Sequence, residues 1–483
     1  MRWHPMLIRF AIYLSFQSER AYEALRSSGV LKLPNKSTLK DYTGFVKAKP
    51  GFQPHVFKGI RKTVNDLADN KKFAVLLIDE MTVRQDLVYD KRGGEIVGFI
   101  SPETWNFKKH TETSIATHVL VFMTMGVNNH IKSSVGFFPT VTATADVMYP
   151  LMWQAVAYLE QAGLKVISVT SDKAAPNQKL YQMHGSGKIV HETTNFYARE
   201  NRPFFFISDV PHLVKTLRNN LENSWEGGKR CLWNGQHLLW SHIRKVAFDD
   251  TTRPLRLTKL KEEHVRLNPS SRMSVKLAVQ VMSRTVGLVL QEYYGEDVQT
   301  TAEFLLKVNR FFDCLNGRSF TEHIAKRNSD VAPYKSVSDE RFQVLQSFVD
   351  YLNEWRDRVL KREGYSRSEK EKMFLTSQTY VGVLTTVQGF TGATKYLLDN
   401  GVEYVFSNIF NQDPLEEHFG RHRGLGRRLR NPSILEFGHQ EKKLDLQRSL
   451  AFVFQPKGNT KGKQKEKVQI TVTDEPLAKV KRH

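Results

Sequence analysis

Cysteine is scarce in this chain of 483 residues, which has only Cys231 and Cys314. So few cysteines exclude a disulfide framework, and two that lie so far apart exclude a zinc finger built from a compact cysteine set. The sequence also lacks any apolar run of the roughly 18 residues that a transmembrane helix needs, so no membrane partner is expected. The N-terminus has no signal-peptide pattern. A reducing compartment suits this composition.

Acidic residues are outnumbered by basic ones. The chain has 71 Lys and Arg against 50 Asp and Glu, which gives a net charge of +21 and a pI near 9.7. Such an excess predicts a polyanionic partner, most often nucleic acid; the alternative is a basic surface that only keeps the protein soluble. A chain of this length is expected to form roughly two to four domains.

One acid stands at the end of a short apolar run. Residues 74–78 read Ala-Val-Leu-Leu-Ile, and Asp79 follows. Such a run predicts a buried central strand. An Asp there is costly to bury unless a partner, a proton or a metal compensates it. Asp79 is therefore predicted to be either a satisfied structural acid or a metal ligand. Two further acids follow predicted strands, Asp172 after 166–169 and Asp209 after 204–207.

The order of the predicted elements resembles the RNase H-like fold, an α/β class with a mixed sheet. Antiparallel strands come first, and they are followed by helix, strand, helix, strand and helix; the strands are expected at 74–79, 85–89, 95–100 and 118–126, and the first helix at 144–162, with Pro150 as a kink or as its first turn. In that fold the first strand is central and the fourth lies beside it, which would bring Asp172 near Asp79. Two such carboxylates repel each other unless a divalent cation such as Mg²⁺ lies between them.

The chain divides into five predicted regions. These are a helical N-terminal region (1–68) that is either a helix-turn-helix or a plain helical hairpin, the first part of the RNase H-like core (69–222), a helical insertion (223–400), the last part of the core (401–440) and a basic, largely disordered tail (441–483). Ser37 or Thr38 is expected to cap the helix that begins there, and a further helix is expected at 60–67. The insertion is predicted from long amphipathic stretches at 275–293, 300–314 and 339–361.

A further helix start is predicted near residue 413. Pro414 suits a first helical turn with Asp413 as its N-cap, and Glu416 and Glu417 then fall in that turn. A helix that brings a third carboxylate back to the sheet would complete a three-acid site. The segment from Arg421 to Arg430 is rich in arginine and is predicted either to contact phosphates or to form a solvated basic loop.

Taken together, the motifs resemble those of the P-element transposase family and its THAP-domain relatives in animals. They follow the family order over about residues 3 to 437, at 33–42 (LPNKSTLKDY), 77–81 (LIDEM), 171–177 (SDKAAPN), 209–220 (DVPHLVKTLRNN) and 411–416 (NQDPLE). The resemblance implies a DDE triad of Asp79, Asp172 and Glu416 with two Mg²⁺ ions, which cleaves DNA and transfers the strand. Glu416 is preferred over its neighbour because the family's acid directly follows Leu. At 417 and 418 this chain departs from the amide and the aromatic residue usual in the family.

The same resemblance implies GTP as a cofactor that is not hydrolysed. The chain has no glycine-rich phosphate loop ending in GK[ST]. The positions that resemble the family's nucleotide contacts are Asp209, Lys215, Asn309, Phe312, Asp313, Asn316 and Asp413. An ionised carboxylate accepts hydrogen bonds and suits the N–H edge of guanine, and Phe312 could stack on the base. The alternatives are that Asp209 caps its helix and that Phe312 is core.

The implied partners are DNA, as transposon ends and target, and further copies of the chain in a dimer or tetramer. A nuclear location follows from these partners. The family's zinc-binding THAP domain would need several cysteines upstream of Trp3, and none is there. We therefore expect either a fragment of a longer product or a chain that works with its N-terminal helices alone. The alternative function is that of a domesticated, catalytically inactive DNA-binding or regulatory protein; the three carboxylates favour the transposase.

Overall fold

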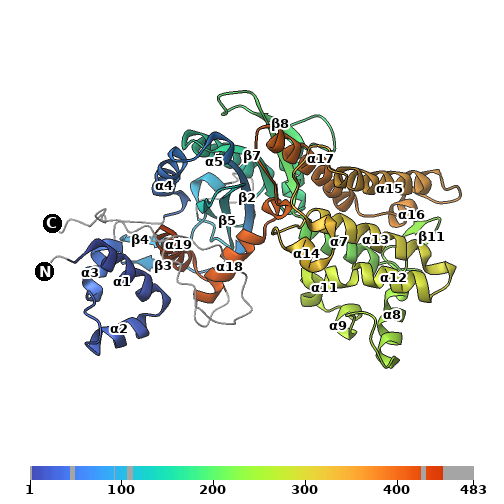
Figure 1. Cartoon of the computed structure of the whole chain (residues 1–483), viewed down its shortest axis with the longest axis horizontal. Helices are drawn as coiled ribbons and strands as arrows, with labels where there is room; N and C mark the ends of the chain where they lie inside the picture. Colours follow the sequence, from blue (N-terminus) through green and yellow to red (C-terminus); the bar gives the residue numbers. More distant parts are fainter. Residues whose placement is uncertain (1–2, 44–48, 92, 106–112, 426–430, 450–483) are drawn as a thin grey trace.

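A seven-stranded mixed sheet forms the centre of the molecule (Figure 1). The computed structural model describes residues 3–43, 49–91, 93–105, 113–425 and 431–449. The strand order is β1-β6-β5-β2-β7-β9-β8. The strands are β1 (Gly51–Phe52), β2 (Phe73–Thr82), β5 (His118–Gly126), β6 (Lys132–Thr140), β7 (Lys165–Ser171), β8 (Glu192–Asn195) and β9 (Arg202–Ser208). The predicted mixed-sheet α/β core is confirmed, and β2 is its central strand.

The predicted hairpin near residue 90 is also present, but it forms a sheet of its own. Strands β3 (Val88–Asp90) and β4 (Glu95–Val97) pair with each other and with no strand of the central sheet. The strand that follows β5 in the central sheet is instead β6, which was not predicted from the sequence. It pairs antiparallel with β5, as β5 does with β2.

Alternating side chains of β2 divide the core between the two faces of the sheet. Ala74, Leu76 and Ile78 pack with helices α4 (Pro54–Asn65) and α5 (Ala145–Gln161). Phe73, Val75 and Leu77 pack into the larger cluster with α7 (Val210–Glu222) and α17 (Ser377–Asp399). This period of two is what a strand buried on both faces requires. Pro150 lies inside α5, so it is not the first turn of that helix.

Three short helices at the N-terminal end form a small cluster of their own. Helices α1 (Pro5–Gln17), α2 (Glu19–Ser27) and α3 (Lys36–Thr43) enclose buried residues that include Ile8, Tyr22 and Leu39. The predicted cap of α3 was wrong. Asn35 precedes this helix, and its Oδ1 accepts a hydrogen bond of 2.8 Å from the backbone N–H of Thr38. An Asn side chain just before a helix satisfies this free donor as well as Ser or Thr does.

The insertion is helical, as predicted, and extends from the sheet on the side away from α1–α3 (Figure 1). It contains α8 (Trp240–Thr252), α9 (Glu262–Val265), α10 (Pro269–Met273), α11 (Val275–Val281), α12 (Arg284–Tyr293), α13 (Gln299–Cys314), α14 (Glu322–Lys326), α15 (Arg341–Lys361) and α16 (Arg367–Lys372), with the short hairpin β10 (Trp233–Asn234) and β11 (Gln236–His237). The stretch 275–293 is two helices rather than one. The break lies at Ser283, whose extended backbone precedes α12.

Helix α17 falls within the range predicted for the insertion, yet it packs directly on the sheet. A Cβ atom on Gly389 would lie 2.2 Å from the carbonyl oxygen of Phe206 in β9, so only glycine allows this close approach. The Thr386 hydroxyl bonds both the N–H and the C=O of Ser208, each at 3.0 Å. Helix α17 therefore fixes the end of β9, and Asp209 is the next residue.

The chain returns to the sheet through α18 (Asp413–Leu425) and then α19 (Ile434–Ser449). Helix α18 begins at Asp413 itself, one residue earlier than predicted, because Gln412 already accepts the first helical hydrogen bonds. The predicted disordered tail from 441 is wrong for 441–449, which belong to α19. Residues 426–430 and 450–483 lie outside the described part, and they include Arg427, Arg428 and Arg430 of the predicted phosphate-contacting segment. Among the described helices, none is long and apolar enough to cross a membrane.

Candidate active site

Two acids lie side by side where β7 ends. Strand β2 continues past the predicted end at Asp79 to Thr82, so Asp79 lies within β2, whereas Asp172 directly follows β7. Strands β2 and β7 are parallel neighbours, and Leu77 is paired with Thr170. Two residues further along each strand the chain reaches Asp79 and Asp172. Both carboxylates line one cavity of about 210 Å³. The predicted proximity of these two acids therefore follows from the register of the sheet.

The environment of Asp79 disfavours its charged form. Its Oδ1 accepts a hydrogen bond of 2.8 Å from the backbone N–H of Glu80. Burial first, and then the charge of Asp172, raise the pKa of Asp79 to about 7. Two neighbouring carboxylates repel each other when both are ionised, and a divalent cation between them would relieve that repulsion.

Asp172 is held at the start of the next helix. Its Oδ1 accepts a hydrogen bond of 2.8 Å from the N–H of Ala174 and one of 2.5 Å from the side chain of Asn177 in α6 (Ala175–Gln182). Both bonds use the same oxygen, so among the described contacts Oδ2 is left to a ligand. The two hydrogen bonds fix the direction in which the carboxylate points.

Gln412 ties the returning chain to both β2 and α7. Its backbone N–H donates to Asp209 Oδ1 at 2.7 Å, and its side-chain amide donates to the carbonyl oxygen of Ile78 at 2.6 Å. The other oxygen of Asp209 accepts from the N–H of His212 at 2.9 Å, so Asp209 also caps α7. Sequence reasoning missed the role of Gln412, and its only signal was its place just before a predicted helix start.

Glu416, in the first turn of α18, reaches the same region. Its Oε1 lies 3.8 Å from Nε2 of His212, a residue that sequence reasoning missed although it stands three positions after Asp209. Burial raises the pKa of Glu416 despite the neighbouring imidazole. Figure 1 shows α18 passing beside β2.

Lys215 lies among these acids. Its side chain is buried, and burial lowers its pKa while the charges of Asp172, Asp209, Glu416 and Asp79 act in the opposite direction. We call these four acids, gathered around Lys215, the acid cluster. A second lysine that sequence reasoning missed, Lys173, is close by; burial lowers its pKa to about 8. Asp79 and Asp172 thus line one cavity, and Glu416 lines another. The charges of these three predicted triad residues act on Lys215, as does that of Asp209, and Asp209 and Lys215 are two of the residues predicted to contact the nucleotide.

Four of the other predicted nucleotide residues lie along α13 and just after it, and the fifth, Asp413, is the first residue of α18. Asp313 Oδ2 accepts hydrogen bonds from the side chains of Asn309 at 2.7 Å and Asn328 at 2.9 Å. Burial raises the pKa of Asp313. The side chain of Phe312 is partly buried against the large core cluster.

Asn316 connects this segment to α18 through Arg318. Asn316 Oδ1 accepts from Arg318 at 3.1 Å and from Asn411 at 3.2 Å. Arg318 in turn forms an ion pair of 2.8 Å with Asp413. Arg318, Asp413 and Glu416 all line one cavity of about 890 Å³. Sequence reasoning missed Arg318, whose signal was its position two residues after Asn316.

Two family models match the chain. The model described as "TNP-like, RNase H N-terminal domain" covers residues 48–185, and that described as "TNP-like, GTP-binding insertion domain" covers residues 211–328. The first range contains Asp79 and Asp172, and the second contains Lys215 and the residues of α13. The helical insertion is therefore a GTP-binding insertion domain by its family, in agreement with the predicted fold class.

Curated and solved relatives agree with these matches. The transposable element P transposase of Drosophila melanogaster is 26% identical over 90% of this chain and 53% of its own length. DNA transposase THAP9 of Homo sapiens is 22% identical over 64% of this chain and 35% of its own. The chain thus spans about half, or less, of these relatives.

A solved structure titled "Drosophila P element transposase strand transfer complex" shares the fold with a TM-score of 0.75. The match covers 93% of this chain and 92% of that one at 24% identity. With both domain models, both relatives and this fold in agreement, the chain belongs to the P-element transposase family.

Proposed function

We propose that this chain is a DNA transposase of P-element type that cleaves DNA and transfers the strand with a DDE triad of Asp79, Asp172 and Glu416. The observation that carries the proposal is the acid cluster itself. Asp79 on β2, Asp172 just after β7 and Glu416 on the distant helix α18 all act through their charge on the buried ammonium group of Lys215. Asp209 and Lys215 are buried here, and Asp79 and Asp172 are partly buried. Ionisable groups gathered in this way cost free energy to bring out of water and are typical of a functional site.

The triad residues fit divalent metal ions. Carboxylate oxygens are the ligands that Mg²⁺ prefers, and the raised pKa of Asp79 marks a charge that a cation would compensate. When bound, two such ions activate the attacking water or 3′-OH and stabilise the leaving oxygen. Asn177 orients Asp172, and Gln412 places the start of α18 against β2. These contacts would hold the three carboxylates ready for the ions.

The pKa of Asp79 predicts how pH and metal affect stability. Its folded-state pKa of about 7 lies above the ordinary value of 3.8, so the folded chain binds more protons between these values. The metal-free chain should therefore lose stability as pH rises through this window, by at most ~1.4 kcal/mol per pH unit. Mg²⁺ should restore stability near the upper end, because it binds the ionised carboxylate.

This prediction is checked by thermal unfolding in EDTA and in Mg²⁺ at about pH 5.5 and about pH 8. The variant Asp79→Asn should lose both the pH-dependent difference attributable to Asp79 and most of the gain from Mg²⁺. A matched change of an exposed acid, Asp146→Asn in α5, should behave like the parent chain. If Mg²⁺ stabilised the parent chain and Asp79→Asn equally, the ion would bind elsewhere.

We place GTP in the cavity between α18 and the segment after α13, as a cofactor that is not hydrolysed. The residues there fit a guanine nucleotide: Arg318 can pair with phosphate oxygens, and the Asp413 carboxylate can accept from the guanine edge. Asn316 holds Arg318 in place. Asn309, Phe312 and Asp313 remain predicted contacts on α13. Asp209 and Lys215 do not line this cavity, so they would contact the nucleotide only if it extended to the acid cluster.

Asp413→Ala should weaken GTP binding by roughly tenfold or more, because a hydrogen bond to a charged group contributes ~1.5–3 kcal/mol. Fluorescent GTP titrated in EDTA measures the affinity without the metal site. Asp357→Asn, an exposed acid on α15, is the control and should not change it. Unchanged affinity in Asp413→Ala would remove GTP from this cavity. Unchanged affinity in Lys215→Ala would confine the nucleotide to the Asn316–Arg318–Asp413 side.

The function itself is tested by strand transfer. The assay uses pre-cleaved duplex ends taken from the DNA that flanks the coding sequence, with and without GTP and Mg²⁺. The proposal expects joined product that requires both, formed by a nuclear, DNA-bound dimer or tetramer. Absence of product under every condition, with DNA binding retained, would favour the alternative of a domesticated, catalytically inactive DNA-binding protein.

A further inference from the structure

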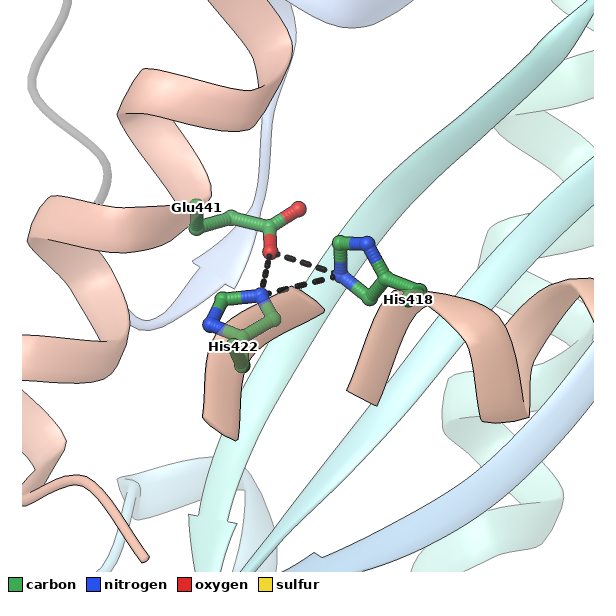
Figure 2. A group of neighbouring side chains, drawn as sticks. All are labelled: His418, His422 and Glu441. Atoms are coloured by element: carbon green, nitrogen blue, oxygen red, sulfur yellow. Dashed lines mark hydrogen bonds and ion pairs between the residues drawn. The ribbon is translucent and has the colours of Figure 1, made fainter. Parts of the chain in front are cut away.

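A group of metal-ligand side chains that includes none of the triad residues lies between α18 and α19 (Figure 2). It consists of His418, His422 and Glu441, and each of these residues is at most 3% exposed to solvent. In the described part of the chain, it is the one set of His, Cys, Asp or Glu residues in which three ligand atoms all lie within 4.8 Å of one another.

The two helices aim these side chains at one point. His418 and His422 stand four residues apart, so they share one face of α18. Glu441 projects from α19 toward both rings, as Figure 2 shows. Its Oε2 lies 2.8 Å from Nε2 of His418 and 2.9 Å from Nε2 of His422, and the two nitrogens are 3.2 Å apart. The three atoms form a nearly equilateral triangle.

Protons alone do not satisfy all three contacts of this triangle when Glu441 is ionised. If both Nε2 atoms carry hydrogen, the contact between them joins two donors. If one of them lacks hydrogen, its lone pair faces the carboxylate. The second case is the one that Gln440 favours, because its Oε1 accepts at 2.9 Å from Nδ1 of His422 and so places the proton on that nitrogen. A cation inside the triangle would accept a lone pair from each corner.

We propose that His418, His422 and Glu441 bind one divalent transition-metal ion, with Zn²⁺ as the best match. Zinc bonds of about 2.0–2.2 Å in a tetrahedral site separate the ligand atoms by roughly 3.4 Å, so the sides of the triangle need to widen by about 0.2–0.6 Å. Two imidazoles favour Zn²⁺ over Mg²⁺, which prefers oxygen.

The surroundings support a fixed site. Gln440 engages the second nitrogen of His422, as partners of metal-bound histidines do. The ring of Phe437 stacks on His422 at 4.0 Å with an angle of 4°. Phe437 also contacts Phe137 of β6 at 5.2 Å. The ion would therefore clamp α18 to α19 and, through Phe437, to the sheet, two residues from Glu416.

The test is the metal content of the full chain. After dialysis against buffer treated with chelating resin, elemental analysis should find about one zinc per chain. Glu441→Gln and His422→Gln should each lose it, whereas Asp79→Asn, which disrupts only the acid cluster, should retain it. Loss of zinc in Asp79→Asn with retention in Glu441→Gln would overturn the proposal, because the metal would then belong to the triad.

A measurement on the unaltered chain keeps the proposal testable if the variants fail to fold. X-ray absorption at the zinc edge should show only nitrogen and oxygen neighbours at about 2.0 Å, including imidazole. A chain that holds less than about a tenth of an equivalent of zinc, and whose unfolding midpoint does not rise on adding Zn²⁺, binds only protons at this site. Sulfur neighbours in the X-ray absorption spectrum would likewise contradict the proposed zinc site.

Discussion

Replacing Asp79 with Asn is expected to abolish Mg²⁺-dependent DNA cleavage while leaving DNA binding intact. The carboxylate is partly buried on the central strand β2, and it lines the same cavity as Asp172. Even partners of metal ligands typically contribute about 10–100-fold to metal affinity or activity, so loss of a direct ligand should lower the rate by roughly a thousandfold. Nicking of supercoiled plasmid in Mg²⁺ measures the rate, and retardation of a labelled duplex measures binding.

Stability separates this chemical effect from misfolding. Because the charge of Asp79 is costly in the metal-free site, Asp79→Asn should be at least as stable as the parent chain in EDTA near neutral pH. Asp146→Asn, the exposed control, should nick at the parental rate. An Asp79→Asn chain that is stable and still nicks DNA would show that Asp79 is a structural acid.

The second large effect is expected from Asp209→Ala, and it falls on stability. This carboxylate is 1% exposed, and its oxygens accept from the backbone N–H groups of Gln412 and His212. Truncation leaves both buried donors unpaired and removes the partner of His212, which should cost about 3–5 kcal/mol. The start of α18 would also lose its tie to α7, so the affinity for Mg²⁺ should fall.

Urea unfolding measures the loss of stability, and Mg²⁺ titration of the folded chain measures the loss of Mg²⁺ affinity. Asp66→Ala, an exposed residue at the end of α4, is the control and should change the free energy of unfolding by less than about 0.5 kcal/mol. The free energy of unfolding of Asp209→Asn should fall between those of Asp209→Ala and the control, because the Asn amide keeps one acceptor and turns the other into a donor. A fully stable Asp209→Ala chain that binds GTP weakly would instead support a direct nucleotide contact.

The fold was predictable where local pattern and burial agree. The apolar run before Asp79 and the runs before Asp172 and Asp209 each form a strand because both faces of the sheet are covered, so most of their positions are apolar. Strand β6 escaped prediction because Pro139 and Gly136 interrupt its pattern, whereas its pairing with β5 is a long-range property. The break at Ser283 and the cap at Asn35 each depend on one residue, and neighbouring residues such as Ser37 and Thr38 would suit the same role.

The site was only partly predictable for a related reason. Acids at strand ends are visible in the sequence, and sheet register brings them together. Gln412, His212 and Arg318 act through contacts with residues that are distant in sequence or on another element, and no local pattern marks them. The pair His418 and His422 is visible as a spacing of four, yet its meaning depends on Glu441 in the next helix.

The double hydrogen bond of Gln412 has a consequence for the nascent chain. During synthesis, Asp79 and Asp172 leave the ribosome long before Gln412, since the whole insertion is made between them. Until Gln412 reaches Ile78 and Asp209, the third acid has no place on the sheet. A half-made chain, even with its first strands folded, therefore lacks a complete triad. In the proposed transposase, the insertion therefore delays completion of the triad until Gln412 and Glu416 have been made.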